Sequence, residues 1–112
     1  MNSYSLTIIP ASDNHPEVRI DTLRINKASI IVRAINHKLR QVIFKLIGER
    51  DKITVTEIFM HLRLEQSVAS QHLAVLRKAG FVKTKREGKF IYYSVNRQRL
   101  QEFNNFVDEL LK

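Results

Sequence analysis

Residues 66–80 constrain the fold most, because their apolar and polar side chains separate onto two sides of one helix. Ala69, Leu73 and Leu76 recur at the spacing of a buried helical face, and Gly80 follows as a helix stop. The opposite side is small or polar with a single charge: Ser67, Ser70, Gln71, Ala74 and Lys78. Solubility alone does not require so neutral a face. Its hydroxyl, amide and methyl groups are those that read base edges in a DNA major groove.

A basic hairpin is expected directly after this helix. Residues 81–85 and 90–95 are β-branched and aromatic, which favours two strands. Residues 86–89 supply the turn, in which Gly88 can take a positive φ. The segment 77–99 carries eight basic side chains against Glu87 alone, so its net charge is +7 of the +8 of the whole chain. Such a segment is either a solvated strip or a surface for a polyanion, which the neighbouring helix face favours.

The N-terminal part divides into an arm and a first helix. Residues 1–16 hold both prolines and are interpreted as an arm, either loosely ordered or a strand that pairs elsewhere, ahead of one domain over residues 17–112. Asp21 can cap a helix that runs to Ile35. Apolar side chains cover more than one side of this helix, which predicts contact with a partner subunit.

Three further helices are expected. Asn36 is a candidate N-cap for a second helix, which Gly48 would end. A short extended piece at residues 52–55 leads into a capping box of Thr54 and Glu57, which opens a third helix to about residue 64. Asn96 is a candidate N-cap for a last helix, whose apolar side predicts a docking surface.

Composition excludes several classes of protein. The 112 residues include no cysteine, which rules out disulfides, thiol redox chemistry and Cys-based zinc sites. No apolar run approaches the roughly 20 residues that span a bilayer, and residues 1–10 do not resemble a secretory signal. We therefore expect a cytoplasmic protein without membrane contact.

The expected order is helix, helix, short strand, helix, helix, two strands, helix, which defines a mainly α winged helix-turn-helix with a small β-hairpin. Residues 34–43, the run Gln66–Val82 and the wing Lys85–Tyr93 resemble the ArsR/SmtB-type family of bacterial repressors. The resemblance extends over residues 22–111. Its most specific part is the helix signature Ser-Gln-His-Leu…Leu-Arg-Lys-Ala-Gly at 70–80.

The resemblance implies a homodimer on double-stranded DNA, with one half-site of an inverted repeat for each subunit. The implied recognition residues are Gln66, Ser67, Ser70, Gln71, His72 and Lys78. The implied wing and backbone contacts are Arg40, Arg77, Lys83, Lys85, Arg86, Lys89 and Tyr93. The dimer contacts expected on the first and last helices are Leu23, Ile31, Ile35, Phe103, Phe106, Val107 and Leu110.

Two departures from the family pattern matter. Glu65 stands where the family usually has a serine N-cap, and a glutamate caps a helix poorly. Thr54 and Thr56 stand where metal-sensing relatives have cysteines, and residues 97–112 contain no histidine. We therefore predict no metal site and no cofactor, and the effector stays unknown.

Two other functions explain less of the sequence. A winged helix can serve as a protein-interaction module without specific DNA binding, but this does not explain the charge of segment 77–99. An enzyme is disfavoured, because the chain has no phosphate-binding glycine loop and no H-E-x-x-H motif. The pair Glu57 and His61, one helical turn apart, is typical of a surface contact.

Overall fold

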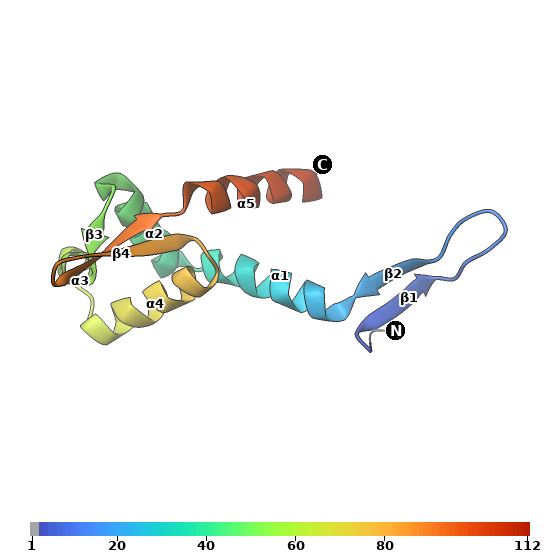
Figure 1. Cartoon of the computed structure of the whole chain (residues 1–112), viewed down its shortest axis with the longest axis horizontal. Coiled ribbons are helices and arrows are strands. Elements are labelled where there is room, and N and C mark those ends of the chain that lie inside the picture. The colour runs from blue at the N-terminus through green and yellow to red at the C-terminus, as the bar shows by residue number, and fades with distance from the viewer. Residues whose placement is uncertain (1–2) are drawn as a thin grey trace. The chain divides into compact units, whose positions relative to one another are not determined.

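The computed structural model describes residues 3–112 and divides the chain into two compact units, Met1–Arg33 and Ala34–Lys112. The elements, drawn in Figure 1, confirm the predicted winged helix-turn-helix, which lies in the second unit. Among the described residues, no helix is long and apolar enough to cross a membrane.

The first unit contains an antiparallel hairpin that leads into a helix. Strands β1 (Ser5–Ile9) and β2 (Val18–Asp21) pair, and helix α1 (Thr22–Ile35) follows without a break. The Asp21 carboxylate accepts from the Arg24 backbone N–H at 3.0 Å, which confirms the predicted cap. The second strand was not predicted. The boundary proposed after residue 16 falls between the two strands and stays a prediction.

The second unit contains four helices and a three-stranded antiparallel sheet. The helices are α2 (Lys38–Arg50), α3 (Val55–Leu62), α4 (Gln66–Lys78) and α5 (Arg97–Leu110). The strands β3 (Ile53–Thr54), β4 (Val82–Glu87) and β5 (Phe90–Val95) are arranged in the order β3-β5-β4.

Both predicted ends of the second helix are wrong. The N-cap is His37 instead of Asn36, and its imidazole accepts from the Arg40 backbone N–H at 3.3 Å. Gly48 lies inside the helix, because packing of α2 against β5 overrides the low helix propensity of one glycine. The helix ends where Asp51 takes a φ of 70°.

The predicted caps of the later helices are confirmed. Thr54 and Glu57 form the complete capping box of α3. The Asn96 side chain accepts from the Arg99 backbone N–H at the start of α5. Helix α3 ends two residues earlier than predicted, because Arg63 adopts the left-handed conformation (φ 56°) that turns the chain toward α4.

The hairpin of β4 and β5 forms the wing. Its ladder extends to the pair Glu87 and Phe90, so the turn consists only of Gly88 and Lys89. The four-residue turn predicted at 86–89 is wrong in length, because a two-residue turn matches the twist of paired strands. Gly88 has the expected positive φ of 62°.

A small apolar core joins these elements, with Phe81 between α4 and β4. Phe81 is completely buried, and its ring meets Phe44 of α2 and Phe103 of α5 edge to face, at centroid distances of 5.8 and 5.4 Å. The buried face predicted for α4 is confirmed, since Ala69, Leu73 and Leu76 have no exposed surface. The core thereby fixes α4 with its opposite face outward.

Candidate nucleic-acid interface

The exposed side of α4 is the side that the sequence predicted. Ser67, Ser70 and Gln71 are exposed, and so are Ala74 and Lys78. None of these five side chains has a hydrogen bond or ion pair within the described part of the chain. Their donors and acceptors are therefore available to an outside partner.

His72 lies at the edge of this face and contacts α2. Its ring is 4.9 Å from the His37 ring, centroid to centroid, and its Nδ1 lies 3.3 Å from Nη1 of Arg40. Burial, and then the neighbouring His37 and Arg40, lower the pKa of His72 below its ordinary value. Both the burial and the nearby positive charge disfavour protonation.

Arg40 is held by the segment before α2. Its Nε donates to the main-chain oxygen of Ala34 at 2.6 Å, and the residue is half-buried. This contact and the His72 contact place Arg40 beside α4, where it joins the ends of α1 and α2 to the recognition helix. Arg40 therefore has a structural role in addition to the DNA contact that the resemblance implies.

The N-terminus of α4 has the weak cap that was expected. Glu65 is the N-cap residue, and its side chain makes no capping hydrogen bond. Gln66 is exposed in the first turn. Backbone N–H groups at a helix N-terminus without a cap are suitable donors for an anion.

The basic residues of the wing lie on both faces of the hairpin, because side chains alternate along a strand. Lys83 lies opposite Ser94 and Lys85 lies opposite Tyr92, so both lysines share one face of the hairpin. Arg86 and Tyr93 lie on the other face, where Tyr93 is half-buried opposite Ile53 of β3. The residues of the predicted wing cluster therefore do not form one continuous stripe.

Near the wing tip, three cations remain exposed: Lys85, Arg86 and Lys89. Arg86 Nε donates to the Gly88 oxygen at 3.1 Å. The acid of the wing, Glu87, is paired with Lys52 at 2.7 Å, and this hydrogen bond holds the pKa of Glu87 below its ordinary value.

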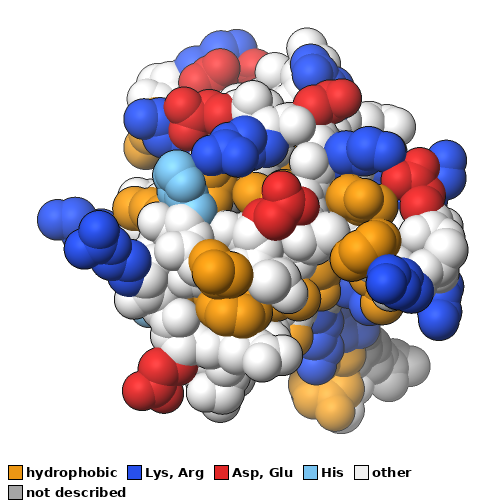
Figure 2. Space-filling model, turned by 90° about the vertical axis from the view of Figure 1, so that its left-hand side faces the viewer, with side chains coloured by type: hydrophobic (Ala, Val, Ile, Leu, Met, Phe, Trp, Pro, Cys, Tyr) orange, Lys and Arg blue, Asp and Glu red, His pale blue; other side chains and the backbone are white. Residues whose placement is uncertain are grey.

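Figure 2 shows the end of the molecule at which the wing tip lies in Figure 1. Lys and Arg side chains are spread over it, with acidic and hydrophobic side chains between them.

Sequence reasoning missed Arg99. This residue belongs to the basic segment 77–99, but its Nε donates to the Ala79 oxygen at 3.0 Å, at the C-terminal end of α4. Arg77 and Lys78 in the last turn of α4 are exposed. No local pattern marked Arg99, because the contact spans 20 residues.

The residues predicted for dimer contacts are not fully buried in the single chain. On α5, Phe106 is 45% and Leu110 is 69% exposed, while Phe103 and Val107 are half-buried. On α1, Leu23, Ile31 and Ile35 are half-buried. Helix α5 has no buried residue at all, so an apolar stripe along α5 faces solvent.

No three metal-ligating side chains come together anywhere in residues 3–112. Glu57 and His61 on α3 have separate partners: Glu57 closes its capping box, and Nδ1 of His61 lies 3.3 Å from Nη2 of Arg50.

A helix-turn-helix with an exposed neutral face on its second helix, followed by a basic β-hairpin, defines a winged helix-turn-helix DNA-binding protein. The comparisons with known proteins agree. Residues 38–84 match the family model described as "Bacterial regulatory protein, arsR family". An HTH-type transcriptional regulator of Methanocaldococcus jannaschii is 36% identical over 87 residues, which cover 78% of this chain and 98% of that protein. The transcriptional repressor SdpR of Bacillus subtilis is 32% identical over 77 residues, 69% of this chain and 84% of SdpR.

Solved structures show the same fold. Reduced HlyU of Vibrio cholerae is 27% identical with a TM-score of 0.61, over 79% of this chain and 92% of HlyU. The repressor PagR of Bacillus anthracis is 27% identical with a TM-score of 0.61, over 76% of this chain and 97% of PagR. The chain belongs to the ArsR family. It is a DNA-binding transcriptional regulator and not an enzyme.

Proposed function

We propose that the chain represses transcription as a homodimer on an inverted-repeat operator, with α4 of each subunit in the major groove. The observation that carries this proposal is the exposed neutral face of α4, whose Ser70 and Gln71 have no partner within residues 3–112. Gln can bind adenine through two hydrogen bonds, and Ser can donate or accept.

The cations around this face supply affinity that does not depend on sequence. We assign phosphate contacts to Arg77 and Lys78 at the end of α4 and to Lys85, Arg86 and Lys89 at the wing tip, all of which are exposed. Gln66 and Ser67 lie at the N-terminus of α4, where the free backbone N–H groups also suit a phosphate. The proposed interface also includes four residues that lie at its edge or behind it: His72, Arg40, Lys83 and Tyr93.

The apolar stripe of α5 supports dimer formation. Phe106, Val107 and Leu110 recur on one side of the helix, and burial of their exposed area would stabilise a pair of subunits. Helix α1 adds Ile25 and Ile30, which are 52% and 49% exposed. We propose that both helices contribute to the interface, as the resemblance implies.

The N-terminal hairpin extends this interface in our proposal. Its pairs place Leu6 beside Ile20 and Ile9 beside Val18, while Thr7 lies beside Arg19. All four apolar side chains are exposed by 37–52%. An isolated two-stranded hairpin is only marginally stable in water, so a second subunit over its apolar side would stabilise it.

Selection of bound sequences from random DNA tests the proposal. We expect an enriched inverted repeat whose half-sites are about 10 base pairs apart, or a multiple of that spacing, because a two-fold dimer presents two copies of α4. The mass of the complex should correspond to two subunits on one site. A pool without enrichment at low salt, or a single half-site bound by one subunit, would contradict the proposal.

A further inference from the structure

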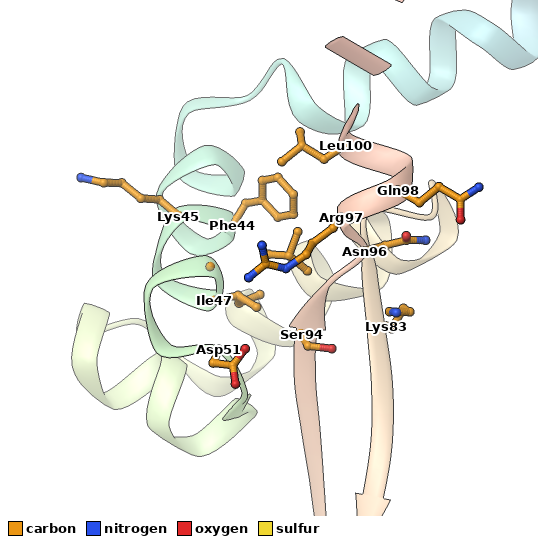
Figure 3. Close-up of a pocket in the computed structure, with 12 residues that line it drawn as sticks. Phe44, Lys45, Ile47, Asp51, Lys83, Ser94, Asn96, Arg97, Gln98 and Leu100 are labelled. Atoms are coloured by element: carbon orange, nitrogen blue, oxygen red, sulfur yellow. The ribbon is translucent and has the colours of Figure 1, made fainter. Parts of the chain in front are cut away.

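A cavity of about 570 Å³ lies on the side of the wing sheet that carries Lys83 and Ser94. Figure 3 shows that its walls come from the second half of α2, from β4 and β5, and from the first turn of α5. Ligand sites for small molecules commonly have volumes of about 300–1,000 Å³. Neither the recognition face of α4 nor the wing tip contributes to its lining.

The cavity combines an apolar wall with positive charge. Phe44 and Leu100, both half-buried, form the accessible apolar part, while Ile47 below them is completely buried. The Arg97 side chain reaches across the cavity toward Ile47, whereas Lys45 and Gln98 point away from it (Figure 3). A cation set against an apolar surface is the arrangement that holds the charged end and the apolar body of one amphipathic anion.

The positive groups of this cavity are not neutralised by the protein. Neither Arg97 nor Lys83 forms an ion pair or a side-chain hydrogen bond within the part of the chain that the structure describes. Asp51 is the one acid among the lining residues, and it lies more than 4 Å from both cations, beyond ion-pair distance. The planar guanidinium of Arg97 can therefore donate two parallel hydrogen bonds to a carboxylate or phosphate.

We propose that this cavity binds a small organic anion, with the acidic group on Arg97 and Lys83 and the apolar body against Phe44 and Leu100. The apolar wall distinguishes the site from a contact for DNA phosphates, which have no apolar body to bury there. Because the cavity joins α2, the wing and α5, the bound anion is a candidate effector of the regulator. Only this last consequence rests on the proposed function.

Titration of the ¹⁵N-labelled full chain with benzoate, phenyl phosphate and neutral benzamide, followed by NMR, tests the site. We expect benzoate or phenyl phosphate to shift the amides of Gly48, Ser94 and Asn96 along saturating curves, and benzamide to bind at least ten-fold more weakly. The better of the two anions identifies the acidic group. No DNA is present, so failure of the site is distinguishable from failure of operator binding.

Two substitutions locate the charge. Arg97→Gln should weaken binding of the better anion at least five-fold, and Lys83→Gln should also weaken it. Lys45→Gln is the matched control, because this side chain points away from the cavity, and it should leave the affinity within two-fold. Shifts that do not saturate, equal binding of benzamide, or full affinity of both Arg97→Gln and Lys83→Gln would overturn the proposal.

Discussion

The Nε atom of Arg99 donates a hydrogen bond to the main-chain oxygen of Ala79 at 3.0 Å, which joins the first turn of α5 to the C-terminal end of α4. The last carbonyls of a helix lack partners within the helix, and a cation near them is favourable. A Cβ on Gly80 would lie 3.0 Å from this Nε atom, and Gly80 has a φ of 88°. The recognition helix is thus held at its end by a residue 20 positions later.

Arg99→Ala should lower the free energy of unfolding by about 1–2 kcal/mol, because a charged hydrogen bond is lost at a half-buried helix end. Urea unfolding followed by circular dichroism measures the change. Gln98→Ala, on the same helical turn and exposed, is the control and should change stability by less than about 0.5 kcal/mol. Equal stability of the two variants would show that the hydrogen bond contributes nothing.

Gln71→Ala should weaken binding to the selected operator by about 1–3 kcal/mol and relax the base preference at one position of each half-site. Fluorescence anisotropy on the operator and on a scrambled duplex measures both effects. Gln101→Ala, an exposed glutamine on α5, should change neither. If the Gln71 variant binds its operator as tightly as the unmodified protein, Gln71 does not contact a base.

Lys85→Ala should weaken binding to operator and scrambled DNA by the same factor. The loss of one phosphate contact should lower the slope of log K against log salt by about 0.9. DNA-binding titrations at salt concentrations of about 50 to 300 mM, which bracket physiological ionic strength, give this slope. Lys112→Ala, which removes a cation paired with Glu109 at the end of the chain, should leave the slope unchanged. A loss confined to the operator would assign Lys85 to base recognition instead.

Phe106→Asp should convert the proposed dimer to a monomer at micromolar concentration, because a carboxylate would be buried in the proposed apolar interface. Sedimentation velocity or light scattering measures the mass. Gln101→Glu introduces the same charge on the opposite side of α5 and should remain dimeric. A Phe106→Asp variant that stays dimeric would remove α5 from the interface.

The stability of the protein should fall as the pH drops below about 6.5, and His72 should account for part of this dependence. The pKa of His72 in the folded protein lies below its ordinary value. The unfolded chain therefore binds a proton more readily than the folded chain, so the contribution is complete above pH 6.5 and is lost as the pH falls. Urea unfolding is measured between about pH 7.5 and pH 5.5, roughly one unit on each side of the ordinary pKa of histidine. The free energy of unfolding should depend less on pH for His72→Gln than for the unmodified protein. His15→Gln is the control, and equal slopes for both variants would contradict the assignment.

The local spacing of residues in the sequence was enough to predict the class of protein and most boundaries of the helices and strands. The periodicity of Ala69, Leu73 and Leu76 predicted which side of α4 is buried, and capping residues such as Thr54 and Asn96 marked where helices begin. These signals are reliable because they involve residues within one or two helical turns, whose geometry is fixed once the helix forms. Capping was less decisive before α2, where His37 and not Asn36 accepts the backbone N–H of Arg40.

The sequence by itself therefore determined the winged helix-turn-helix, its outward polar face and its basic hairpin. Only the tertiary structure decided that Arg99 holds the end of α4, that His72 contacts Arg40, and that Lys83 lines a cavity with Arg97, on the other face of the hairpin from Arg86. The physical reason is that each of these relationships depends on strand alternation or on the packing of elements far apart in the chain. Residue type and local spacing do not encode which distant side chains meet.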